Sequence, residues 1–111
     1  MLEELTRAGH PVTGCGLLLA SGRPLPALPA ILASHPLIHT AEGELFREAL
    51  RVASAECGLQ VTAVKERDLT SSIPPALQSN IQKLGSTIGP PWRQDEKFSA
   101  MAAWLALHTA R

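Results

Sequence analysis

The sequence lacks tyrosine, and aromatic residues make up only 4% of its 111 positions. Any hydrophobic core must therefore be built mainly from leucine, isoleucine, valine and alanine. Hydrophobic residues still account for 45% of the chain, which excludes an intrinsically disordered segment. The length is that of one folded domain. We expect residues 1–111 to form a single small domain.

The chain also lacks a net charge, because Lys and Arg number 10 and Asp and Glu number 10. It therefore has no global positive field of the kind that drives binding to nucleic-acid backbones, and such a role would need a local basic patch. A net charge near zero instead permits self-association. The apolar runs are shorter than the roughly 18 residues that a membrane span requires, so we expect no membrane association.

Cysteine is scarce, with only Cys15 and Cys57. Two widely spaced cysteines do not make a disulfide framework, so we expect both thiols to be buried and reduced. This favours a reducing compartment, the cytoplasm. The acidic start Met1–Glu4 lacks the basic region of a signal peptide, which agrees with a cytoplasmic location.

Two apolar segments, Val12–Ala20 and Leu59–Lys65, are predicted to be strands. Consecutive leucines in the first indicate that both of its faces are covered, as in a parallel sheet. Gly16 either weakens this strand or lets another backbone approach it closely. Ala41–Cys57 is predicted to be an amphipathic helix with Thr40 as its N-cap. The order strand, helix, strand predicts an α/β fold around a central parallel βαβ unit.

The remaining segments are predicted to be flanking helices and loops. His35-Pro36 is expected to break a short helical turn over Ala30–Ser34. Ser71 or Ser72 is expected to cap a third helix, and Trp92 is expected to plug the core. The other elements are a short helix over Leu2–Ala8, a proline-rich loop over Ser21–Pro29 and a last helix from Asp95 to Leu107.

Two strands are too few for a stable open sheet. Either the region around Met1 adds a strand or a second chain completes the layer, and we favour a homodimer.

The central helix carries an acid on its apolar face. At about 100° per residue, Glu42 lies in the middle of that face, whereas Glu44 points to solvent. Because burying a lone carboxylate is costly, we expect Glu42 to have a partner. The apolar face consists of Leu45, Phe46, Ala49, Leu50, Ala53 and Cys57.

The start of this helix is expected to lie at the C-terminal edge of the sheet, where α/β folds bind ligands. Glu66 and Asp68 follow the second strand to the same edge, and His39 precedes the helix. A histidine with carboxylates can bind Mg²⁺ or Mn²⁺, or act as acid and base. The candidate catalytic residues are His39, Glu42, Glu66 and Asp95, with Glu42 and Asp95 as candidate metal ligands.

A simpler interpretation stays open for the same residues. Glu42 and Glu44 can be acids that stabilise a helix N-terminus, His39 can cap a backbone group, and Asp95 can be an N-cap.

The order of a strand, an amphipathic helix, a strand and a helix opened by an aspartate resembles the second half of RNase H-like domains. Holliday-junction resolvases of the RuvC type are the most similar in character. The matching segments are Val12–Ala20, Glu42–Val64 and Asp95–Ala103. The resemblance implies a nucleic-acid partner and two-metal chemistry that uses several carboxylates.

The chain also departs from this family. The family begins with a three-stranded meander whose first strand carries a catalytic aspartate, and no acid ends the Val12–Ala20 strand here. Only Asp95 falls on a matching catalytic position. The resemblance therefore implies a truncated or degenerate relative without independent nuclease activity.

Three functions follow from these observations. We favour a non-catalytic domain that acts through self-association or contacts with another protein. The alternatives are a small metal-dependent or acid/base enzyme and a nucleic-acid-associated RNase H-like domain.

Overall fold

The computed structural model describes residues 1–19 and 24–109. Within these residues the chain forms two strands and six helices, in an α/β arrangement. The elements are α1 (Leu2–Arg7), β1 (Gly14–Leu19), α2 (Leu28–Leu32), α3 (His35–Glu56), β2 (Gln60–Lys65), α4 (Glu66–Ser72), α5 (Pro75–Ile88) and α6 (Gln94–Thr109).

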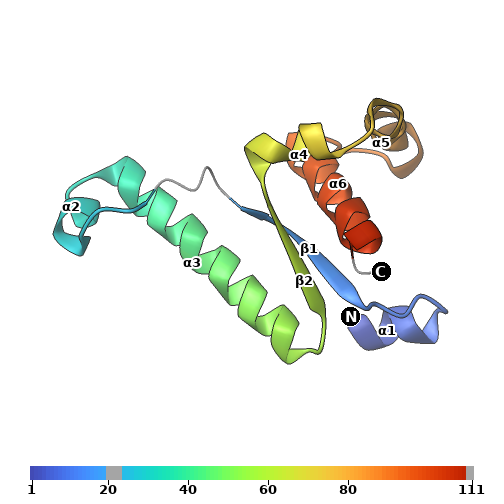
Figure 1. The fold of residues 1–111 in the computed structure, drawn as a ribbon, viewed down its shortest axis with the longest axis horizontal. Coiled ribbons are helices and arrows are strands. Elements are labelled where there is room, and N and C mark those ends of the chain that lie inside the picture. Colours follow the sequence, from blue (N-terminus) through green and yellow to red (C-terminus); the bar gives the residue numbers. More distant parts are fainter. Residues whose placement is uncertain (20–23, 110–111) are drawn as a thin grey trace.

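The two predicted strands form a parallel pair. Their register runs from Gly14 opposite Gln60 to Leu19 opposite Lys65. Helices α3 and α6 cover opposite faces of this pair (Figure 1), which confirms the central βαβ unit. The predicted end of the first strand, Ala20, lies outside the described residues. The region around Met1 forms α1 and adds no strand, so that alternative for completing the sheet is wrong.

The hydrophobic core lies on the α6 side of the sheet, where α4, α5 and α6 meet. Its buried members come from all three helices and the residue that follows α4, and are Leu69, Ile73, Ile81 and Met101. Trp92 packs against this cluster, and its indole Nε1–H donates to the carbonyl of Ile81 at 2.9 Å. The prediction that Trp92 plugs the core is confirmed.

Helix α6 lies directly on β1 because Gly16 has no side chain. A Cβ at Gly16 would collide with the backbone carbonyl of Ala102. Of the two readings of this glycine, close approach of another backbone is the correct one.

Helix α3 begins six residues earlier than predicted. Ser34 is its N-cap and accepts a hydrogen bond from the Leu37 N–H at 3.5 Å. Pro36 lies in the first turn, where its missing N–H leaves no hydrogen bond unmade, so His35-Pro36 starts this helix and does not break one. Thr40 is inside the helix, and its hydroxyl donates to the Pro36 carbonyl at 3.0 Å.

The predicted third helix corresponds to α5, and a further helix that the pattern does not predict, α4, precedes it. The polar run after β2 begins α4 at Glu66, and a separate helix, α5, starts at Pro75. The hydroxyls of Ser71 and Ser72 do not cap α5, because both donate back to the Asp68 carbonyl. The two helices are separate because Pro74 cannot continue α4, whereas Pro75 occupies the first turn of α5.

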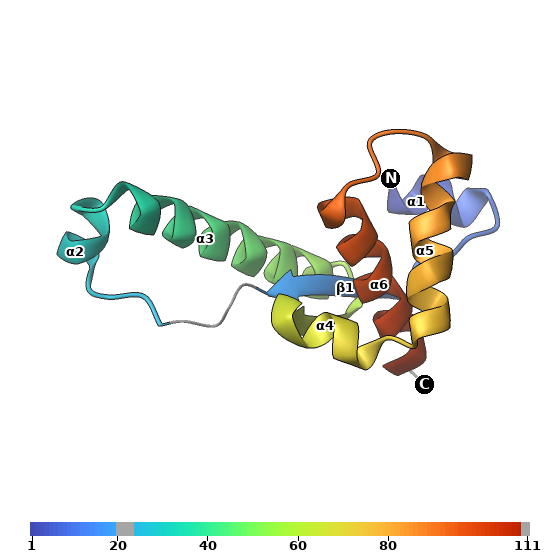
Figure 2. The same ribbon diagram turned by 90° about the horizontal axis from the view of Figure 1, so that it is seen from above.

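The molecule is elongated, with principal extents of 48 × 31 × 28 Å. Its radius of gyration is 16.1 Å, whereas a compact domain of this length has about 13 Å. The excess comes from α2 and the first half of α3, which project beyond the sheet as an arm (Figure 2). Among the described segments, no helix is both long and apolar enough to cross a membrane.

Candidate functional site

Glu42 does not face the protein interior. Its side chain is 56% exposed and lies on the arm formed by α3. The expectation of a buried carboxylate is wrong, because the apolar face of α3 on which Glu42 lies is turned toward solvent. A carboxylate in water needs no buried partner.

Glu42 nevertheless lies next to histidine. Its Oε2 is 3.5 Å from Nδ1 of His39, one helical turn earlier. The Nε2 of His39 is in turn 3.0 Å from Nε2 of His35. The three side chains thus form a row along the N-terminal part of α3, and all are exposed. Sequence reasoning missed His35, although its spacing of four residues from His39 is a signal that could have identified it.

The other two predicted site residues lie on a different part of the molecule. Glu66 begins α4, and its Oε1 accepts a hydrogen bond from the side-chain amide of Gln94 at 3.3 Å. Asp95 follows Gln94 in the first turn of α6. A shallow groove of about 430 Å³ is lined there by Glu66, Arg67, Thr70, Gln94 and Phe98.

The structure therefore does not bring the four candidates together. His39 and Glu42 lie on α3, whereas Asp95 belongs to α6 on the opposite face of the sheet (Figure 1). Across residues 1–19 and 24–109, no group of three or more His, Cys, Asp or Glu side chains is arranged to hold a metal ion. A shared Mg²⁺ or Mn²⁺ site of Glu42 and Asp95 has no geometric support. Asp95 is also not the N-cap of α6, because the helix begins at Gln94 and Asp95 lies inside its first turn.

Most of the apolar face of α3 is exposed to solvent. Leu45 is 68% exposed, Phe46 67% and Leu50 56%. The helix instead approaches the sheet through a different side, whose half-buried members are Gly43, Arg47 and Ser54. The short α2 adds two exposed leucines to the same arm, Leu28 and Leu32.

The polar side of α3 is an ordinary solvated surface. Arg51 Nε donates to Glu48 Oε2 at 2.9 Å, as the spacing of the pair predicts. This hydrogen bond, together with the charge of Arg51, holds the pKa of Glu48 below its usual value. Cys57, expected to be buried, is exposed just beyond the end of α3, and Cys15 on β1 is half-buried.

A second groove lies between α1, the start of β1 and α6. Its volume is about 490 Å³ and its walls are mostly apolar. The lining residues are Leu5, His10, Pro11, Val12, Thr13, Gly14, Gly16, Ala103, Ala106 and Leu107. Among these lining residues only His10 can act as an acid or base, so the groove can make apolar contacts but lacks a group of catalytic side chains.

Comparison with protein families, curated proteins and solved structures finds no match to this chain. The function must therefore be argued from the site itself.

Proposed function

We propose that this domain is a protein-interaction module, and that its partner is a second copy of the same chain held through the apolar face of α3. The observation that carries this proposal is the exposure of Leu45, Phe46 and Leu50, each by more than half, along one helix. Monomeric soluble proteins rarely leave such a contiguous apolar surface uncovered.

The expected affinity depends on the free energy gained by burying apolar side chains and the free energy that association costs. Full burial of a leucine or phenylalanine side chain is worth about 1.5–3 kcal/mol, so six such side chains from two copies contribute on the order of 10 kcal/mol. That contribution is comparable with the roughly 4–15 kcal/mol that association costs. A net gain of about 8 kcal/mol, which corresponds to a dissociation constant near 1 μM, lies within the difference between these two ranges, and we expect an affinity of that order.

A second copy is favoured over a different protein for two reasons. The chain has no net charge, so two copies do not repel each other. An apolar helix face is also self-complementary, which suits the two-fold interface of most homodimers. A 22-residue helix is about 33 Å long and can pair with its copy over several turns.

The proposal is tested by light scattering on two variants that each place a glutamate on α3. Phe46→Glu changes the apolar face, whereas Ala55→Glu changes an exposed position on the other side of the helix. We expect the wild-type chain and Ala55→Glu to reach twice the 11.8 kDa chain mass at high micromolar concentration. Phe46→Glu is expected to remain at the monomer mass.

Circular dichroism provides the control for folding. Phe46 is exposed, so Phe46→Glu is expected to keep the helical signal and melting temperature of the monomer. A wild-type chain that stays monomeric at these concentrations, or a Phe46→Glu variant that dimerises like Ala55→Glu, would refute the proposal.

A second candidate is association with nucleic acid as a degenerate RNase H-like domain. It is supported by the parallel strand pair with a helix on either face and by Asp95 in the first turn of α6. Because the chain has no net charge, we expect it to bind branched DNA only at low salt. Binding is expected to be lost at a salt concentration of about 0.2 M. A gel-shift assay that shows no complex at low salt removes this candidate.

A further inference from the structure

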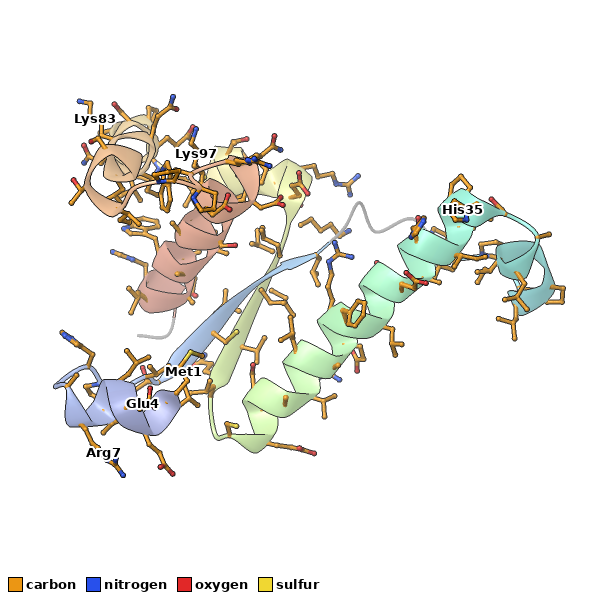
Figure 3. All side chains as sticks on the ribbon, turned by 180° about the vertical axis from the view of Figure 1, so that it is seen from behind. Met1, Glu4, Arg7, His35, Lys83 and Lys97 are labelled. Carbon is orange, nitrogen blue, oxygen red and sulfur yellow. The ribbon has the colours of Figure 1, made fainter. Side chains whose placement is uncertain are left out.

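Two imidazole rings lie edge to face in the N-terminal part of α3. His35 Nε2 and His39 Nε2 are 3.0 Å apart, and the rings are nearly perpendicular at 86° with centroids 4.5 Å apart. Both side chains are exposed, and Figure 3 shows His35 at the end of α3 that is remote from the sheet. The pair belongs to neither groove, and it continues the stripe of the apolar face of α3 toward the start of the helix.

We infer that this pair binds a late first-row divalent cation, with Zn²⁺ as the reference ion. Imidazole nitrogens lie about 2.0–2.1 Å from zinc, so two of them on one tetrahedral ion are about 3.3–3.4 Å apart. A square-planar ion places them about 2.9 Å apart. The observed 3.0 Å lies between these values, so the two nitrogens already have the separation that a shared ion requires.

Glu42 supports this arrangement from behind His39. Its carboxylate faces Nδ1 of His39 at 3.5 Å, which favours the tautomer that keeps the proton on Nδ1. The Nε2 lone pair of His39 then points to His35, and it becomes available to a metal when the Nε2 proton of His35 leaves. Glu42 also adds negative charge where the helix N-terminus disfavours a cation.

Metal binding changes which ring nitrogen of His35 carries the proton. In the metal-free pair, His35 Nε2–H donates to His39 Nε2 when His39 carries its proton on Nδ1. Metal binding requires His35 to carry its proton on Nδ1 as well, and solvent exchange allows this because the ring is exposed. Two neutral histidines then supply two ligands, and water completes the coordination.

An ion bound by two residues one turn apart requires that turn to be helical. It therefore stabilises the N-terminal part of α3 relative to the unfolded chain. Only two protein ligands are involved, so the site is expected to exchange its metal readily.

The inference is tested by titrating the intact chain with Zn²⁺, using calorimetry for affinity and imidazole nitrogen NMR for location. We expect the Nε2 signals of His35 and His39 to shift together. His35→Ala and His39→Ala are each expected to raise the Zn²⁺ Kd more than about tenfold, and Glu42→Gln about tenfold, as for other residues that orient a ligand.

His10→Ala and His108→Ala are matched controls, because each removes one exposed histidine elsewhere. Both are expected to keep the wild-type Kd. The inference is overturned if His35→Ala or His39→Ala binds Zn²⁺ as tightly as the wild type. It is equally overturned if the imidazole NMR shifts occur at His10 or His108 instead.

Discussion

Gly16 and Gly43 differ in the atoms that an added methyl group would meet, so substitution by alanine is expected to change stability in opposite directions. At Gly16 a Cβ would meet the rigid backbone of Ala102 in α6. At Gly43, inside α3, it would meet only the guanidinium of Arg47 at 3.0 Å, the end of a flexible side chain. Gly16 therefore has no room for a side chain, whereas at Gly43 the side chain of Arg47 can move aside.

Gly16→Ala is expected to lower the free energy of unfolding by about 1–3 kcal/mol, because α6 must move away from β1. Urea denaturation followed by circular dichroism measures the change. An unfolding free energy equal to that of the wild type would show that α6 does not rest on β1 as described.

Gly43→Ala is expected to act in the other direction. Alanine in a helix interior is favoured over glycine by about 0.5–1 kcal/mol, and only Arg47 has to shift. The same urea experiment is expected to show a more stable chain. A loss of stability would mean that the side of α3 that carries Gly43 packs more tightly on the sheet than its contacts indicate.

Single residues were predicted well where the local pattern decides their role, and poorly where the surroundings decide it. The prediction that Trp92 plugs the core is confirmed, and at Gly16 the structure selects one of the two predicted alternatives, close approach of a backbone. Glu42 was correctly placed on the apolar side of its helix, but nothing in the helical period tells whether that side is covered. The predicted metal site of Glu42 and Asp95 required two distant segments to meet, and the local pattern does not determine whether they do.

The helices and strands differ in how firmly the sequence defines them. Both strands and the helix α6 match their predicted ranges within two or three residues, because apolar periodicity defines them. The start of α3 was misplaced because Pro36 was interpreted as a helix breaker, although proline is favoured in the first turn. Ser34, directly before His35-Pro36, is the capping residue that marks this start in the sequence.

The start of α3 can be tested with two matched substitutions. Ser34→Ala removes the N-cap and is expected to cost about 0.5–1 kcal/mol, at the low end because the hydrogen bond is 3.5 Å long. Thr40→Ala lies inside the helix and is expected to change the unfolding free energy by less than about 0.5 kcal/mol. Urea denaturation showing the reverse order would place the helix start at Thr40.

The whole molecule has a core on one side of its sheet and an exposed apolar helix face on the other. The amphipathic pattern of α3 correctly groups its apolar residues, but amphipathicity alone does not say what they pack against. Here the core is supplied by α4, α5 and α6, and α3 approaches the sheet through small or polar residues. That division of the chain explains both the elongated shape and the proposed pairing.

The most direct test is an NMR experiment on a mixed sample of isotope-labelled and unlabelled chains, filtered for contacts between different molecules. If two copies pair through α3, the Phe46 ring of one chain must show intermolecular contacts to Leu45 or Leu50 of the other. Intermolecular contacts confined to another surface, or none at concentrations on the order of 1 mM, well above a micromolar Kd, would contradict the account.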